Sequence, residues 1–271
     1  MPTRPEMVLQ IETADERAWA DMYAAIPQDF AQRLALGHTA AGGYPVFCCA
    51  RVPFIHFNAV GSTFGLRGPV SDADLDALRA AYATRGIGRH WLHTVPAVLP
   101  ADLRGRLADR GYTESSRWDR VVRRPAPPPA ARPDGPRRIE VRAVEWGTAE
   151  AWAEFVDGVY GLPTSPWLVA LVDRPGWRHY VALEAGRIVA ARSCFLSDGW
   201  GWLGIDAPVP GAMTKDYLPD QAILDVVVRE VSNHHIIADI EAPDPERRGP
   251  AYGIFAGLDF EVAYTRVNLV R

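Results

Sequence analysis

Residues 71–86, SDADLDALRAAYATRG, open a block that predicts a helix, a short strand, a second helix and, after Tyr112, another strand. The same order of predicted elements returns 148 positions later, in a block from Pro219 to Phe260 whose first helix is DQAILDVVVREV (220–231). Self-similarity at a fixed spacing is the signature of a structural unit that is present more than once. The sequence therefore predicts two copies of one mixed α/β unit.

The composition bounds the size and excludes some classes of protein. A chain of 271 residues with 48% hydrophobic residues has room for two cores of about 130 residues each on the usual length prior. Its net charge of -4, with Lys215 the only lysine among 29 basic residues, gives no basic footprint for nucleic acid. No run approaches the roughly 18 apolar residues that cross a bilayer, and the amino terminus lacks the apolar core of a secretory signal. We expect a cytoplasmic protein with no nucleic-acid or membrane partner.

A proline-rich segment divides the chain. Residues 125–136, PAPPPAARPDGP, cannot continue a helix or a central strand, and such sequences form semi-rigid extended spacers. We place an amino-terminal unit at 1–125, a linker at 126–136 and a carboxy-terminal unit at 137–271.

The carboxy-terminal unit has a readable order of elements. Residues 139–146 alternate as a strand, and residues 148–162 follow as a helix. A hairpin turns at 184–186, and GWGWLGIDAPV (199–209) predicts the next strand. With the second block of the repeat, the order becomes β-α-β-β-β-α-β-α-β.

Three stretches carry a resemblance to a known family. Residues 177–207, WRHYVALEAGRIVAARSCFLSDGWGWLGIDA, and residues 237–268, IADIEAPDPERRGPAYGIFAGLDFEVAYTRVN, resemble the GNAT superfamily, the acyl-CoA N-acyltransferases. Residues 56–87 resemble the first unit of bacterial proteins with two GNAT units in tandem. The resemblance implies an α+β fold of two tandem units, each a mixed central sheet flanked by helices. It also implies acyl transfer from acetyl-CoA or another acyl-CoA to a small-molecule amine.

The sequence departs from the family where the family binds the CoA diphosphate. GNAT enzymes use backbone N–H groups at a helix start after an Arg/Gln-x-x-Gly-x-Gly/Ala loop, because a helix amino terminus attracts anions and glycine permits close approach. The matching residues 214–221, TKDYLPDQ, contain no glycine. Pro219 has no N–H, and Asp216 and Asp220 add negative charge. The segment predicts weak or absent binding of acyl-CoA.

Two interpretations of this helix start are open. It is either an ordinary capped helix that no longer binds a nucleotide, or an altered cradle in which the resemblance places acyl-CoA beside Lys215, Tyr217, Leu218 and Gln221. In the amino-terminal unit, Ser71 precedes the corresponding helix as a plain cap.

The resemblance also suggests catalytic residues. Many GNAT enzymes use a tyrosine to protonate the departing thiolate. Here Phe255 occupies the commonest position of that tyrosine, so Tyr252 is the candidate acid, with packing of its ring as the alternative. Glu241 and then Asp206 are the candidate bases, each with a solvated carboxylate at a strand end as the alternative.

Two tryptophans and the absence of metal motifs complete the prediction. Trp200 and Trp202 share one face of a strand and either pack in the core or line a substrate pocket. No spacing of His, Cys or acidic residues predicts a metal. The sequence leaves two functions open: an N-acyltransferase, or a GNAT fold that has lost CoA and binds a small molecule or catalyses a CoA-independent reaction.

Overall fold

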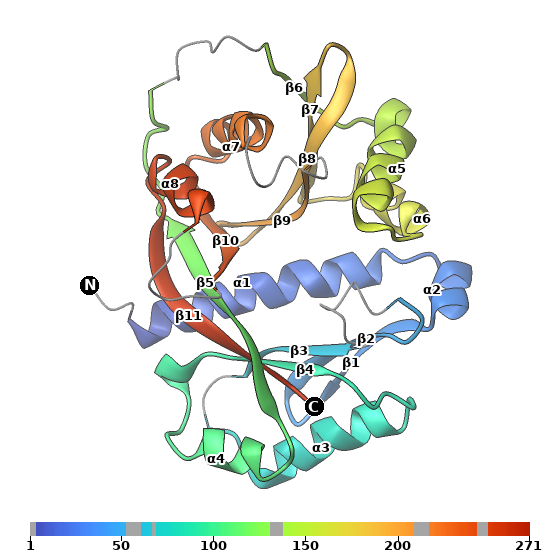
Figure 1. Ribbon diagram of the computed structural model, residues 1–271, viewed down its shortest axis with the longest axis vertical. Coiled ribbons are helices and arrows are strands. Elements are labelled where there is room, and N and C mark those ends of the chain that lie inside the picture. The colour runs from blue at the N-terminus through green and yellow to red at the C-terminus, as the bar shows by residue number, and fades with distance from the viewer. Residues whose placement is uncertain (1–3, 53–60, 67–68, 131–137, 209–216, 243–248) are drawn as a thin grey trace. The chain divides into compact units, whose positions relative to one another are not determined.

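The structure is a computed structural model that describes residues 4–52, 61–66, 69–130, 138–208, 217–242 and 249–271 (Figure 1). The chain divides into two compact units. Unit 1 comprises Met1–Arg120, Asp239–Arg247 and Val262–Arg271. Unit 2 comprises Val121–Ala238 and Arg248–Glu261.

Unit 1 begins with helices α1 and α2, and the described residues continue with strands β1 to β5 and helices α3 and α4. Their bounds are α1 Pro5–Ala24, α2 Gln28–Leu34, β1 Leu36–Ala41, β2 Tyr44–Cys49, β3 Gly61–Leu66, α3 Asp72–Ala83, β4 Trp91–Thr94, the 3-10 turn η2 Pro96–Val98, α4 Leu103–Ala108 and β5 Thr113–Arg123. Strand β5 passes from unit 1 into unit 2 at its end.

The chain after β5 follows the order predicted from the sequence, and it lies in unit 2 except for the end of β10 and nearly all of β11, which belong to unit 1. Its elements are β6 Glu140–Ala143, the 3-10 turn η3 Trp146–Thr148, α5 Ala149–Tyr160, α6 Ser165–Val169, β7 Trp177–Glu184, β8 Arg187–Ser197, β9 Trp200–Pro208, α7 Leu218–Glu230, β10 His235–Glu241, α8 Pro250–Ala256 and β11 Glu261–Val270. Apart from the short α6, this is the predicted β-α-β-β-β-α-β-α-β order.

The two units contain the same pattern of strand pairing, which confirms the predicted fold class. In unit 1, β1–β2 and β2–β3 are antiparallel and β3–β4 is parallel. In unit 2, β7–β8 and β8–β9 are antiparallel and β9–β10 is parallel. Each parallel pair is connected by a helix, α3 in unit 1 and α7 in unit 2, as a parallel crossover requires. The strand predicted at 199–209 is β9, and β10 is its parallel neighbour.

Helices cover both faces of the strands in each unit. In unit 1, α1 lies on one side and α3 and α4 on the other; in unit 2, α7 lies on one side and α5 and α6 on the other (Figure 1). The amphipathic helix α3 turns Leu75, Leu78 and Tyr82 into the unit 1 core, where Leu103 and Leu107 of α4 meet them. Burial of such side chains contributes about 2 kcal/mol each.

The last strand of the chain belongs to unit 1. Residues 267–270 of β11 pair antiparallel with β4, and the Thr94 hydroxyl donates to the carbonyl of Val267 at 2.7 Å. Leu269 joins the same core as α3. The compact units therefore group the end of the chain differently from the limits 1–125 and 137–271, which remain a prediction for independently folding domains.

A network of polar side chains, buried except for the half-buried Asp239, fixes α1 against strands β5, β10 and β11. Its members are Glu12, Asp15, Arg120, Asp239, Tyr264 and Arg266. Arg266 donates to Glu12 at 2.8 Å and to Asp15 at 2.5 Å. Because buried charges are tolerated only when they are paired, these contacts specify where α1 packs.

Candidate functional site

A bulge interrupts strand β9 in unit 2. On β8, Ser193 pairs with Gly204 and Ala191 with Ala207, so the single residue between them faces two residues of β9, Ile205 and Asp206. Two residues opposite one define a β-bulge, which bends the strand and re-aims its backbone groups.

The backbone at the bulge is in an unusual conformation. Ile205 has φ 48°, in the left-handed region that β-branched residues rarely adopt. The neighbouring Gly204 allows a close approach, since a Cβ there would lie 1.8 Å from the ring of Trp202. Left-handed conformation costs an ordinary residue roughly 1–2 kcal/mol, so the surrounding contacts must hold this segment in place.

Arg192 is the residue of β8 opposite the bulge, and its side chain is buried. Its Nε and Nη2 donate to the two carboxylate oxygens of Asp220 at 2.9 and 3.0 Å, and its guanidinium lies 3.7 Å from Asp206. Burial alone would lower the pKa of Arg192, but the carboxylates of Asp220 and Asp206 raise it above its ordinary value. Arg192 therefore carries a fixed positive charge that links the bulge to the first turn of α7.

Tyr160 reaches the bulge from the last position of α5. Its hydroxyl donates to the backbone carbonyl of Asp206. Burial of the hydroxyl, followed by the charge of Asp206, raises the pKa of Tyr160. Gly161 ends α5 in the left-handed conformation, so the helix stops where Tyr160 meets β9.

Helix α7 begins beside this cluster. Tyr217 is its N-cap residue and makes no side-chain capping hydrogen bond, while Pro219 and Asp220 lie in the first turn. The predicted acyl-CoA contacts Tyr217, Leu218 and Gln221 are all half-buried, and Lys215 lies outside the described residues. Asp220 does not offer an unbalanced charge here, because Arg192 holds its carboxylate.

The parallel ladder next to the bulge is short. It pairs His235, Ile236 and Ile237 of β10 with residues 200–202 of β9. The bulge at Ile205 and Asp206 follows these pairs in β9, and its two residues have no partner in the register with β8.

The predicted catalytic residues lie on three different elements. Asp206 sits in the bulge with its side chain 57% exposed. Tyr252 is half-buried on α8 in unit 2, and Glu241 is an exposed residue at the end of β10, in the part of that strand that belongs to unit 1. Phe255 is buried and packs edge-on against Phe260 at 5.0 Å between ring centroids.

The two predicted pocket tryptophans have different surroundings. Trp202 is 6% exposed, lies over Gly204 and meets Trp177 edge-on. Trp200 is half-buried and stacks on His235 at 4.5 Å. A role in a substrate pocket stays a prediction for both.

Sequence reasoning missed Arg192 and Tyr160. Arg192 had a usable signal, because it interrupts the apolar run of a strand predicted to be buried, and a buried guanidinium requires an acidic partner. Tyr160 had none, since a tyrosine at a helix end is ordinary.

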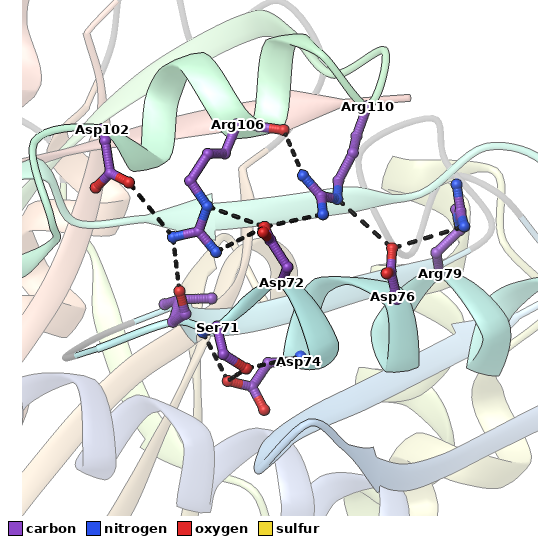
Figure 2. A network of polar contacts seen from close by, with 9 residues as sticks. Ser71, Asp72, Asp74, Asp76, Arg79, Asp102, Arg106 and Arg110 are labelled. Atoms are coloured by element: carbon purple, nitrogen blue, oxygen red, sulfur yellow. Dashed lines mark hydrogen bonds and ion pairs between the residues drawn. The ribbon is translucent and has the colours of Figure 1, made fainter.

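At the corresponding helix start in unit 1, that of α3, the polar groups are paired with nearby side chains (Figure 2). Ser71 accepts from the backbone N–H of Asp74 at 3.1 Å, and Asp74 accepts from the backbone N–H of Ser71 at 2.8 Å, which completes a capping box. Arg106 and Arg110 both donate to Asp72 at 2.9 Å. Ser71 is therefore the helix cap that the sequence predicted.

The comparisons with known proteins identify the fold. A GCN5-related N-acetyltransferase from Kribbella flavida is 17% identical with a TM-score of 0.61, covering 88% of this chain and 91% of that chain. One from Sphaerobacter thermophilus is 17% identical at a TM-score of 0.55, over 68% of this chain and 59% of that chain. A tandem GNAT protein from the clavulanic acid biosynthesis pathway is 15% identical at a TM-score of 0.54, over 84% and 78%. The chain has the GNAT fold.

Sequence comparisons add no closer relative. No protein-family model matches the chain, and no curated protein matches it. Across the part of the chain that the structure describes, no group of His, Cys, Asp and Glu side chains is arranged to hold a metal ion. No helix among the described residues is both long and apolar enough to cross a membrane.

Proposed function

We propose that the protein is an N-acyltransferase that moves an acyl group from acyl-CoA to the amine of a small molecule, with the acyl site in unit 2. The observation that carries the proposal is the bulge at Ile205 and Asp206 of β9. A bulge leaves its extra residue out of the strand ladder. Backbone N–H groups released in this way can stabilise the negative charge that develops on an attacked carbonyl oxygen.

The start of α7 supports binding of the CoA diphosphate. The positive end of a helix dipole attracts phosphate, and the Asp220 carboxylate is compensated by Arg192 at 2.9 Å. Tyr217, Leu218 and Gln221 would contact the diphosphate, and Lys215 stays a contact that the sequence alone predicts. Acyl-CoA would supply the acyl group as an activated thioester.

Proton transfer would be carried out by the residues predicted from the sequence. Tyr252 would donate a proton to the leaving sulfur, and Asp206, in the same unit, would accept the proton of the attacking amine. Glu241, which belongs to unit 1, stays the alternative base that the sequence predicts. Phe255 has no proton to donate and packs against Phe260.

A second function is favoured by one feature of the same helix start. Pro219 has no N–H, and no glycine occurs in residues 214–221. These features weaken a diphosphate site and favour a GNAT fold that binds a small molecule without CoA. The solved structures named as acetyltransferases support the first function by analogy of fold only.

One experiment separates the two functions. Calorimetric titration with acetyl-CoA and a longer acyl-CoA is combined with thiol release in the presence of a panel of small amines. Binding together with amine-dependent thiol release supports the acyltransferase. Absence of binding for every acyl-CoA overturns it and favours the CoA-independent function.

Single substitutions then assign the roles. Tyr252→Phe removes only a hydroxyl, and loss of a general acid lowers kcat by about 100-fold. Glu241→Gln and Asp206→Asn distinguish the two candidate bases by the same measure. Phe255→Tyr is the converse variant, because it places a phenol at the family's usual acid position.

A further inference from the structure

The bulge in β9 needs external support. Ile205 holds φ 48° although its side chain is β-branched, and a residue in this region persists only when the surrounding structure over-determines it. The residue that follows it, Asp206, receives two contacts that originate on other elements.

The first contact comes from α5. The Tyr160 hydroxyl donates to the Asp206 carbonyl, although the Tyr160 residue as a whole is 45% exposed. The hydroxyl is the atom by which the Tyr160 side chain reaches the bulge, so Tyr160→Phe removes this contact and keeps the ring.

The second contact comes from β8 and α7. Arg192 is 7% exposed, faces the bulge, and is itself held by the two hydrogen bonds to Asp220. Its distance of 3.7 Å to Asp206 places a fixed positive charge beside the bulge. A planar guanidinium with a bidentate partner is a rigid support.

We propose that Tyr160 and Arg192 are positioning residues that hold the Ile205–Asp206 bulge in the geometry that receives the acyl carbonyl. Tyr160 acts through the backbone carbonyl of Asp206, and Arg192 acts through the Asp206 side chain. The proposal rests on the acyltransferase function proposed above. It predicts that strain at Ile205 and the hydroxyl of Tyr160 are energetically coupled.

A double-mutant cycle tests the coupling without any substrate. Glycine adopts positive φ without strain, so Ile205→Gly removes the need for support. Tyr160→Phe lowers the urea midpoint of unfolding in the wild-type background and lowers it by about half as much or less in the Ile205→Gly background. Equal shifts in the two backgrounds overturn the proposal.

Tyr180→Phe is the matched control in the same unit. The Tyr180 hydroxyl donates to Glu230 at 2.5 Å, at the last residue of α7 and away from β9. Its removal lowers stability by the same amount with Ile205 or Gly at position 205. If Tyr180→Phe is coupled to Ile205→Gly as strongly as Tyr160→Phe is, then Ile205→Gly changes the effect of any lost hydroxyl in the unit. That result would overturn the proposal that Tyr160 supports the bulge.

Turnover separates positioning from a merely structural role. Tyr160→Phe lowers kcat about 10-fold with KM for acyl-CoA changed less than about 2-fold, and Ile205→Gly restores most of the lost kcat in the double variant. Unchanged kcat in Tyr160→Phe, measured below its unfolding transition, overturns the positioning role.

The two proposals fail in different ways. If the wild type neither binds nor turns over acyl-CoA, the function and the acyl-positioning role both fall, while the unfolding cycle still shows whether the bulge is supported. If the wild type is active but the unfolding cycle shows no coupling, only the inference on Tyr160 and Arg192 falls.

Discussion

Helices α3 and α7 occupy the same place in the repeat but begin differently. At α3, Ser71 caps the helix and the exposed carboxylate of Asp72 is paired by arginines from α4 and the residues after it. At α7, no capping side chain is provided by Tyr217, and Asp220 is held by the buried Arg192 of β8. In unit 1 the polar groups at the start of α3 pair with residues of the same helix and of the α4 region. In unit 2 Arg192 links the start of α7 to the bulge in β9.

The largest difference is expected when one arginine is removed from each helix start. Arg192→Gln leaves Asp220 without its bidentate partner in a mostly buried site, and we expect a loss of about 3 kcal/mol in the free energy of unfolding. Arg106→Gln acts on an Asp72 side chain that is 65% exposed and should cost less than about 1 kcal/mol. Urea denaturation of both variants measures the difference, and equal losses would contradict the comparison.

Replacing both partners at α7 sharpens the same contrast. The double variant Arg192→Met/Asp220→Leu removes both charged partners, so neither is left in the site without the other. We therefore expect its free energy of unfolding to be about 2 kcal/mol higher than that of Arg192→Gln. The recovery should appear in stability but not in turnover, because the proposed support of the bulge is lost. A double variant as unstable as Arg192→Gln would show that Asp206 also depends on the arginine.

The order of the elements could be predicted because it depends on local patterns. The repeat and the apolar periodicity placed α3, α7, β9 and β10 in the correct order. Ser71 was predicted as a cap because serine directly before a helix is a common cap, and the structure adds its partner Asp74, three residues away. Residues that are close in sequence reveal such local contacts.

The contacts that define the candidate site are not local. Arg192 and Asp220 are 28 positions apart, and Tyr160 meets Asp206 across 46 positions. Reading the sequence alone treated Asp220 as an unbalanced charge because its partner comes from another element. Likewise, an isoleucine gives no sign of a left-handed bulge, and the proline-rich linker gives no sign that β11 pairs with β4.

A smaller effect is expected from the caps themselves. Ser71→Ala removes one half of the capping box and should cost about 1 kcal/mol, with faster hydrogen exchange in the first turn of α3. Tyr217→Ser should change stability by less than about 0.5 kcal/mol, because Tyr217 has φ -93° and ψ 4°, away from the extended conformation in which a serine caps. Slower exchange in the first turn of α7 in Tyr217→Ser would show that the two helix starts are equivalent after all.

The smallest effect is expected from acid at the start of α3. The hydrogen bond from Arg106 lowers the pKa of Asp72, and the hydrogen bond from the Ser71 side chain lowers the pKa of Asp74. A carboxylate whose folded pKa lies below its unfolded value adds stability above the unfolded pKa, and this contribution is lost as the pH falls through the folded value. The wild type should therefore be more stable than Asp72→Asn at about pH 6, and the gap should close below about pH 4. Urea midpoints of both proteins across this range measure the gap at each pH, so acid effects shared by the two proteins cancel. A difference in stability that stays constant with pH would mean that the Asp72 side chain acts by its shape and not by its charge. The charge pairing of Asp72 with Arg106 and Arg110 would then not stabilise the start of α3.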